Sequence, residues 1–207
     1  MAEHGTHRRP GATTCGQLAA RTSRVDTISV GGATPKPRIC QRRPWSRVRA
    51  YSGLVEVSTR LGTRLDAATL ASLLADFNRE FEAPTPPLSA LVDRFERILG
   101  ESAVVAILAE AEDPVGFALI TLRPTPYHDG PLAQLDELYV VPKLRGSGIG
   151  TRILDLAIST LRSRDVHEMH INVDEIDDGA RRFYERHGFV NIEPGADYRM
   201  LCYLREF

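Results

Sequence analysis

The chain has 207 residues, of which 43% are hydrophobic, and its formal net charge is -1. This length allows one large domain or one domain with a tail, and the apolar content suffices for an ordinary core. No stretch approaches the roughly 18 consecutive apolar residues that cross a bilayer, so the sequence predicts a soluble protein with no membrane span.

The charge is distributed unevenly along the chain. Residues 1–50 carry ten Lys/Arg against two acidic residues, whereas residues 51–207 carry sixteen against twenty-five. The first segment is rich in Arg, Gly, Pro, Thr and Ser, a composition too polar to offset the entropy of ordering. We therefore predict a disordered basic N-terminal tail at residues 1–50 and one folded domain at residues 51–207.

Other origins of the basic segment remain open. A start codon placed too far upstream would give a similar composition, and so would a transit peptide or a nucleic-acid-binding arm. Nucleic acid is the less favoured partner, because few aromatic residues lie among the basic ones.

The cysteines and histidines indicate neither a disulfide framework nor a metal site. Cys15, Cys40 and Cys202 form no C-x-x-C pair, and a reducing cytoplasm is the expected compartment. His167 and His170 are three residues apart, whereas strand residues on one face are two apart. The sequence thus predicts no bound metal.

The first half of the domain predicts a strand followed by two helices. Residues 54–57 have strand character, and Asp66 offers a helix N-cap before apolar residues at helical spacing up to Phe81. Prolines then interrupt the chain, and residues 88–99 predict a second amphipathic helix, closed by Gly100.

The second half alternates strands and helices without an internal repeat. The expected crossovers would cover both faces of one mixed sheet, which makes the fold class α/β. The predicted elements are strands at 104–108, 115–122, 135–141 and 169–173, helices at 148–164 and 178–187, and two last strands at 189–192 and 199–204.

The most informative segment is a glycine-rich turn between a strand and a helix. Residues 138–151 read Leu-Tyr-Val-Val-Pro-Lys-Leu-Arg-Gly-Ser-Gly-Ile-Gly-Thr. Glycines let the backbone approach a ligand and turn N–H groups inward, and the helix N-terminus adds unpaired donors with a partial positive charge. This pattern predicts a pyrophosphate site, with a purely structural turn as the alternative.

Two other phosphate motifs fit this turn poorly. A Rossmann fingerprint needs its third glycine at position 151, which is Thr151. A P-loop needs Lys and Ser/Thr after its last glycine, whereas Thr151 and Arg152 follow Gly150.

Two segments resemble motifs of the GNAT superfamily of N-acetyltransferases. Residues 140–150, Val-Val-Pro-Lys-Leu-Arg-Gly-Ser-Gly-Ile-Gly, match its R/Q-x-x-G-x-G/A signature together with the preceding strand and proline. Residues 180–189, Ala-Arg-Arg-Phe-Tyr-Glu-Arg-His-Gly-Phe, match a second motif at the expected distance. By element order the resemblance covers about residues 52–207. It departs at Asp177, where the family often has an Asn that touches the cofactor.

The resemblance implies a mixed, mostly antiparallel central sheet with helices on both faces, and acetyl-CoA as the acyl donor. Main-chain groups of Leu138 and Val140 would pair with the pantetheine arm as an extra strand would, and the Val140 N–H would polarise the thioester carbonyl. Arg145 would add charge near a phosphate or stand as an exposed loop cation. The cofactor-binding residues expected are Leu138, Val140, Val141, Arg145, Gly146, Ser147, Gly148, Ile149, Gly150, Thr151 and Tyr184.

Acetyl transfer to an amine needs a base, because alkyl amines have a pKa of about 10, and a proton for the leaving thiolate. Tyr184 matches the family position that protonates the coenzyme A sulfur, although packing in the core is the alternative role. Glu137 and Asp136 are the candidate bases. Strand alternation would put them on opposite faces, so at most one would point into the cleft. We favour Glu137, with water alone as a further alternative.

The acceptor is the least specified part of the reaction. The acidic loop 174–178 could attract a cationic amine, but acidic residues before a helix also serve as capping. Residues 84–99 and 127–129 occupy places where the family builds acceptor specificity. The sequence thus predicts an acetyl-CoA-dependent N-acetyltransferase for a primary amine of a small molecule or protein. A non-catalytic acyl-CoA-binding module is the alternative, and a homodimer is compatible with either.

Overall fold

A computed structural model describes residues 56–205, so the tail predicted at residues 1–50 lies outside the described residues. The described part contains five strands, four α-helices and two 3-10 turns. In chain order they are β1 (Ser58–Leu61), η1 (Arg64–Asp66), α1 (Ala67–Glu80), α2 (Leu88–Ile98), β2 (Val104–Glu110), β3 (Pro114–Arg123), β4 (Leu132–Val140), η2 (Pro142–Leu144), α3 (Ile149–Arg162), β5 (Met169–Ile171) and α4 (Asp178–Arg186).

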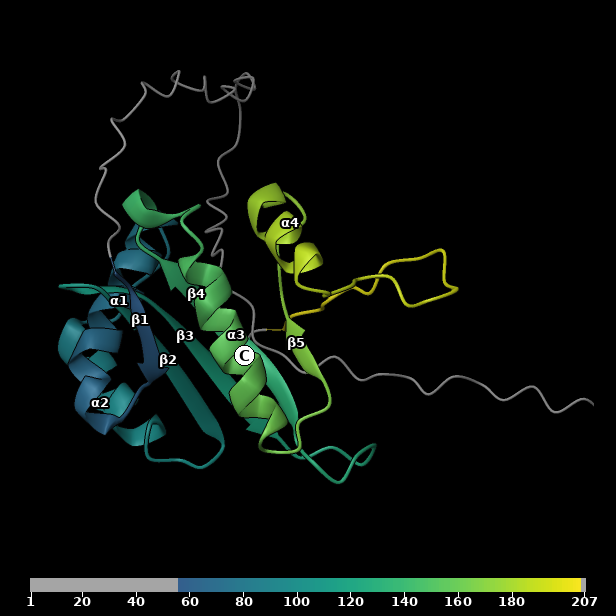
Figure 1. Cartoon of the computed structure of the whole chain (residues 1–207), viewed down its shortest axis with the longest axis horizontal. Coiled ribbons are helices and arrows are strands. Elements are labelled where there is room, and N and C mark those ends of the chain that lie inside the picture. Colours follow the sequence, from purple (N-terminus) through teal and green to yellow (C-terminus); the bar gives the residue numbers. More distant parts are fainter. Residues whose placement is uncertain (1–55, 206–207) are drawn as a thin grey trace, which may run out of the picture.

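The strands form one sheet in the order β1-β2-β3-β4-β5. The first three pairings are antiparallel and the β4–β5 pairing is parallel. This confirms the predicted α/β class with a mixed, mostly antiparallel sheet. Figure 1 shows α3 crossing one face of the sheet, with α1 and α2 packed on the other side.

Each face of the sheet has its own hydrophobic core. Ile107 and Leu108 are consecutive and both fully buried, yet Ile107 belongs to the cluster that includes α3 and Leu108 to the cluster under α1 and α2. Successive strand residues point to opposite faces, so a strand covered on both sides must be apolar throughout. Burying each such side chain contributes roughly 1.5–3 kcal/mol, which is why the central strands read as continuous apolar runs.

The first strand starts later than predicted. β1 begins at Ser58, while Val57 packs in the core without strand pairing, and residues 54–55 lie outside the described residues. β1 pairs with β2 from Ser58 opposite Glu110 to Leu61 opposite Ile107.

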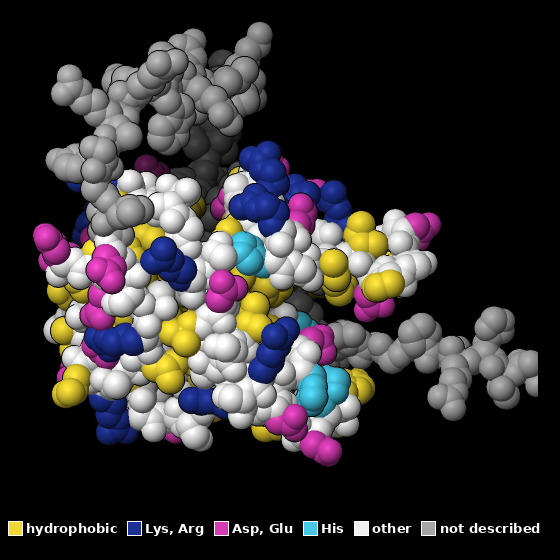
Figure 2. All heavy atoms as spheres, in the orientation of Figure 1, with side chains coloured by type: hydrophobic (Ala, Val, Ile, Leu, Met, Phe, Trp, Pro, Cys, Tyr) yellow, Lys and Arg dark blue, Asp and Glu magenta, His cyan; other side chains and the backbone are white. Residues whose placement is uncertain are grey.

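The two last predicted strands are wrong, because neither 189–192 nor 199–204 forms a strand in the described chain. Val190 is 66% exposed and Tyr203 is 79% exposed, so these residues do not pack on a sheet face. One backbone hydrogen bond, from Met200 N to Asn191 O at 2.7 Å, links the two segments. Strand propensity needs a pairing partner and a surface to cover, and Figure 2 shows the hydrophobic side chains of this projecting segment lying open.

No helix between residues 56 and 205 has both the length and the apolar content needed to cross a membrane.

Candidate functional site

β4 separates from its parallel partner halfway along its length. β5 pairs only with the first part of β4, from Ala133 opposite Met169 to Leu135 opposite Ile171. β3, in contrast, stays paired with β4 as far as Val140. Residues 136–140 of β4 therefore present an edge to which no described strand is paired.

A β-bulge marks the point where β4 and β5 part. Leu135 pairs with Ile120 and Glu137 pairs with Leu119, so Asp136 is the extra residue. A bulge of this kind bends the strand and re-aims the side chains beside it, and such bulges are common next to active sites.

The bulge interrupts the strand alternation on which the prediction of opposite faces for the two candidate bases depended. Leu135 and Leu138 are three residues apart and contact the same core cluster, which strict alternation does not allow. Alternation therefore does not assign Asp136 and Glu137 to opposite faces. The sequence carries a signal for this that was missed, since the apolar positions that share this face are spaced by two, three and two residues, as Ala133, Leu135, Leu138 and Val140.

The main-chain groups of β4 alternate between β3 and the unpaired edge. Val141 N donates to Val115 O at 2.9 Å, so Val141 points toward β3. In an antiparallel ladder every second residue points the other way, which directs the N–H and C=O groups of Leu138 and Val140 toward the unpaired edge. Arg145 Nε accordingly reaches Val140 O at 2.8 Å.

The glycine-rich turn has unpaired main-chain donors. Gly146 and Gly148 have φ angles of 77° and 86°, the left-handed region that favours glycine. Within residues 56–205 we find no acceptor for the N–H groups of residues 146–151, while the Arg145 N–H is tied to Pro142 O at 3.4 Å. The last three of these groups open α3, so the helix dipole adds to an anion-binding arrangement.

α4 docks directly onto this turn. A Cβ at Gly150 would lie 3.4 Å from the Phe183 ring, so the helix packs closely there. His187 Nδ1 donates to Phe183 O at 2.7 Å, and in that tautomer Nε2 accepts from Thr151 Oγ1 at 3.2 Å. These contacts fix the helix that carries Tyr184 relative to the donors at the start of α3.

Acidic residues before α4 act as caps and ion-pair partners. Asp177 is the N-cap, and its Oδ1 accepts from Ala180 N at 2.9 Å. Asp178 pairs with Arg181 at 3.4 Å. Glu175 accepts from Arg199 in the projecting C-terminal segment. Capping is therefore the observed role of Asp177.

Tyr184 combines core packing with a free hydroxyl. Its ring is 8% exposed and packs edge-on against Phe183 and Phe189, at centroid distances of 5.1 and 5.4 Å. Its hydroxyl has no hydrogen-bond partner in the described part of the chain. Burial raises the pKa of Tyr184, with the carboxylates of Asp177 and Glu137 adding to the effect, so the phenol stays protonated at neutral pH.

The two carboxylates at the bulge differ in their environment. Burial raises the pKa of Glu137 to about 7, and the neighbouring Asp136 adds to the shift. Burial also raises the pKa of Asp136, but hydrogen bonds from Thr121 oppose that rise. Asp136 Oδ2 has no hydrogen-bond partner among residues 56–205.

Gln134 is a polar residue that the sequence reasoning missed. It is 5% exposed, and no residue in the described part of the chain donates a hydrogen bond to its Oε1. Gln134 pairs across the ladder with Thr121, whose hydrogen bonds reach Asp136. The signal was a single amide side chain within the apolar run Leu-Ala-Gln-Leu at the start of β4.

The other predicted cofactor residues surround the same turn. Leu138, Val140 and Val141 are partly buried against the core, and Ile149 is 3% exposed. Ser147 Oγ donates to Leu144 O at 2.5 Å and closes the preceding turn. The Arg145 guanidinium contacts Glu80 instead of standing free in solvent.

Three histidines pair with carboxylates near the start of β5. His170 lies 2.5 Å from Glu168, which also faces His128 at 3.5 Å, and His167 lies 3.1 Å from Asp165. Among residues 56–205, no group of three or more His, Cys, Asp or Glu side chains is arranged to hold a metal ion.

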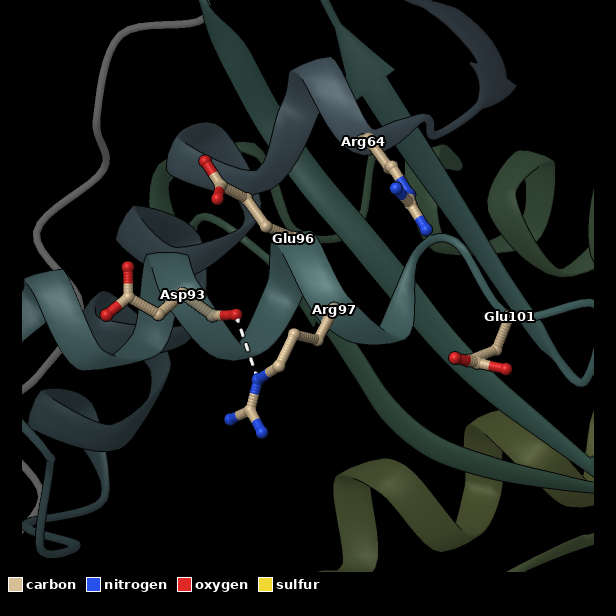
Figure 3. A pocket seen from close by; sticks show the side chains of 5 residues that line it. All are labelled: Arg64, Asp93, Glu96, Arg97 and Glu101. Carbon is tan, nitrogen blue, oxygen red and sulfur yellow. Dashed lines mark hydrogen bonds between the residues drawn. The ribbon is translucent and has the colours of Figure 1, made fainter.

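A separate charged hollow lies beside α2, away from the residues of the glycine-rich turn. Figure 3 shows its side chains spread around an open surface, with Arg97 Nε donating to Asp93 O at 3.3 Å. No predicted catalytic or cofactor-binding residue lines it, although part of its lining comes from residues 84–99, the region expected to build acceptor specificity. Its lining residues are Arg64, Asp93, Glu96, Arg97 and Glu101.

Comparison with known proteins identifies the family of this chain. The model of the acetyltransferase (GNAT) family matches residues 70–189, so the chain belongs to the GNAT family of acetyltransferases. Mycothiol acetyltransferase of Thermobispora bispora is 31% identical over 100 residues. That match covers 42% of this chain and only 34% of the relative's length.

Solved structures share the fold. A protein of Arthrobacter sp. FB24 described as a candidate acetyltransferase is 46% identical, with a TM-score of 0.69 over 75% of this chain and 99% of that one. An aminoglycoside acetyltransferase from an uncultured soil metagenomic sample, in complex with sisomicin, is 18% identical, with a TM-score of 0.61 over 73% of this chain and 96% of that one. The second similarity is evidence for the fold alone.

Proposed function

We propose that the chain is an acetyl-CoA-dependent N-acetyltransferase acting on a primary amine of a small molecule or protein. The observation that carries this proposal is the row of unpaired main-chain donors at residues 146–151, beside the unpaired edge of β4. Residues 146–148 are exposed, so an anionic ligand can reach these donors and replace the water that satisfies them in its absence. A diphosphate is such a ligand, and membership of the family supports this choice.

The residues present fit coenzyme A. The amides of residues 146–151 would hold the pyrophosphate, and the outward groups of Leu138 and Val140 would pair with the amides of the pantetheine arm. When bound, acetyl-CoA supplies the thioester that is the source of the acetyl group. The Val140 N–H, on the unpaired edge, is a donor for charge that develops on the carbonyl oxygen.

Glu137 is the proposed general base. A pKa of about 7 keeps a substantial fraction of its carboxylate ionised at neutral pH while leaving it basic enough to take a proton from the amine nitrogen. Asp136, held by Thr121, is the second candidate, and bulk water is the third. The assignment to Glu137 is supported by its burial, and no residue between 56 and 205 donates a hydrogen bond to its carboxylate.

Tyr184 is the proposed general acid. Its hydroxyl is unpartnered in the described chain, and its raised pKa keeps the proton available for the leaving sulfur. The contacts of Phe183 and His187 with the start of α3 support this role, because they hold α4 against the proposed cofactor loop.

A cationic amine is the acceptor class that the bulge supports best. Gln134 Oε1 and Asp136 Oδ2 are buried acceptors to which no described residue donates, and each such group costs roughly 1–3 kcal/mol unless satisfied. A protonated amine supplies three N–H donors and a positive charge. The name of the mycothiol acetyltransferase that this chain resembles supports acetyl transfer without selecting an acceptor. A cytoplasmic location and a homodimer remain part of the proposal.

The test measures binding and turnover separately. Coenzyme A binding is followed by thermal shift, and thiol release from acetyl-CoA is followed with polyamines, aminoglycosides, amino sugars and lysine peptides. Release that depends on one amine class supports the proposal. Binding of coenzyme A without amine-dependent release across the panel favours the non-catalytic acyl-CoA-binding module, and an absence of binding overturns both.

A further inference from the structure

We propose that Glu80, the last residue of α1, is a positioning residue for the glycine-rich loop and acts through Arg145. Glu80 Oε1 and Oε2 accept from Arg145 Nη1 and Nη2 at 2.6 and 2.7 Å, across 65 positions of sequence. A guanidinium that forks onto a carboxylate is the most geometrically specific of the side-chain ion pairs. The inference rests on the proposed function, since it assigns the loop to a coenzyme A pyrophosphate.

Arg145 is held at every guanidinium nitrogen. Besides the fork onto Glu80, its Nε donates to Val140 O at 2.8 Å, and the guanidinium lies over the Tyr139 ring at 5.6 Å from the centroid. The side chain thus joins the end of α1 to the end of β4. Because Arg145 directly precedes Gly146, fixing its side chain fixes the start of the loop.

The loop needs such support because Gly146 and Gly148 pack against no described residue. A Cβ built at Gly146 or Gly148 would meet no atom within 4 Å. Glycine loses more conformational entropy on ordering than other residues, so donors on an unsupported glycine loop would bind an anion weakly. Contacts that order the loop in advance remove that cost from binding.

Aromatic packing anchors the end of α1 on the buried ring of Tyr139. Phe77 packs on Tyr139 at 5.5 Å between ring centroids, and Phe81 packs edge-on against Phe77 at 5.0 Å. Tyr139 is itself 4% exposed. Glu80 therefore sits between two aromatic contacts, and its carboxylate reaches Arg145 from a fixed position.

A competing role for Arg145 predicts the opposite sign of effect. If Arg145 were a phosphate ligand, Glu80 would compete with the phosphate, and its removal would strengthen coenzyme A binding. If Glu80 positions the loop, its removal weakens binding. The sign of the change thus separates the two roles.

The experiment compares full-length wild type with Glu80→Gln, which keeps the shape but loses the charge. Titration calorimetry with coenzyme A should give a dissociation constant about three- to tenfold higher, as expected for a forked, partly exposed pair. The KM for acetyl-CoA should rise by a similar factor while kcat and the KM for the amine stay constant. Arg145→Lys keeps the charge but loses the two-point contact with Glu80. Its dissociation constant for coenzyme A and its KM for acetyl-CoA should rise by a similar factor.

The matched control is Asp76→Asn, which breaks the 2.6 Å Asp76–Arg79 pair on the same helix. That pair does not touch the loop, so coenzyme A affinity should not change. Backbone NMR order parameters of residues 146–151 in the ligand-free proteins supply a second readout, and they should fall in Glu80→Gln and Arg145→Lys but not in Asp76→Asn.

Unchanged or tighter coenzyme A binding in Glu80→Gln, or unchanged order parameters of the loop amides, would overturn the positioning role. A wild type that binds no coenzyme A would instead overturn the proposed function. In that case the comparison of order parameters still decides whether Glu80 orders the loop.

Discussion

Leu135 and Leu138 lie three residues apart on β4 and pack into the same hydrophobic cluster. The bulge at Asp136 makes this packing possible, and it displaces the neighbouring carboxylates from the regular ladder at the point where β5 ends its pairing. A bulge thus places buried acids beside the unpaired edge of β4. The first two predictions concern the consequences for Glu137.

Substitution of Glu137 by Gln should remove the acidic limb of the pH–rate profile. The pKa of about 7 means that the wild-type rate should rise with pH through this value, as the carboxylate becomes able to accept a proton. Glu137→Gln should lower kcat by a factor of about 10² to 10³. The neighbouring control, Asp136→Asn, should keep the acidic limb of the pH–rate profile. If that limb also survives in Glu137→Gln, another group is the base.

The same substitution should stabilise the protein at high pH. The pKa of Glu137 is raised in the fold above its unfolded value of about 4.3, so its favourable contribution is complete below pH 4 and is lost as pH rises through 7. Glu137→Gln should therefore raise the free energy of unfolding by on the order of 2 kcal/mol at pH 8.5 and little at pH 4. Urea denaturation at both pH values measures this. An equal change in the free energy of unfolding at both pH values would contradict the burial of the Glu137 carboxylate.

Substitution of Tyr184 by Phe tests the general acid. The ring stays in its packing site, and only the unpartnered hydroxyl is lost, so stability and coenzyme A affinity should change little. The value of kcat should fall by a factor of about 10² if the phenol protonates the leaving sulfur. Steady-state kinetics and calorimetry on the same preparation separate the two effects. An unchanged kcat would leave Tyr184 with a packing role alone.

Substitution of Gly148 by Ala tests the turn. Its φ of 86° is strained for a residue with a Cβ, at a cost of about 1 kcal/mol. Gly195 has the same φ of 86° in the projecting C-terminal segment, and a Cβ at either position meets nothing within 4 Å. Both variants should lose similar stability, but only Gly148→Ala should weaken coenzyme A binding, by severalfold. If the two variants bind coenzyme A with equal affinity, the turn is not part of the cofactor site.

Substitution of Asp66 by Asn should destabilise the fold in a pH-dependent way. Hydrogen bonds from Arg60, at 2.7 and 2.9 Å, hold the pKa of Asp66 at about 2, and Thr63 adds to the effect. A lowered pKa contributes stability above the unfolded value of about 3.9, and that stability is lost as pH falls through 2.

Asp66→Asn should therefore lower the free energy of unfolding by about 2 kcal/mol at pH 7, or Tm by roughly 4–8 °C, and the difference should narrow below pH 3. Asp76→Asn, in an exposed pair, should change Tm by less than about 2 °C. A destabilisation by Asp66→Asn that is independent of pH would exclude the ion pair as its cause.

Most regular elements could be predicted from local patterns. Apolar residues at helical spacing marked α1, α2 and α3 to within three residues, because a helix that buries one face must repeat that face about every 3.6 residues. The last two strands could not be predicted in this way. The residues around Val190 and Tyr203 have strand-like composition, but a strand also needs a partner edge and a face to cover, and neither is provided in the described chain.

The sequence by itself determined the glycine-rich turn at residues 138–151 and the helix that follows, since the φ preference of glycine and helical periodicity are properties of neighbouring residues. Only the tertiary structure decided that Arg145 meets Glu80, that Gln134 and Asp136 keep unpaired acceptors, and that the pKa of Glu137 lies near neutrality. Ion pairing, hydrogen-bond satisfaction and burial depend on which distant segments the fold brings together. A local pattern of residues does not contain that information.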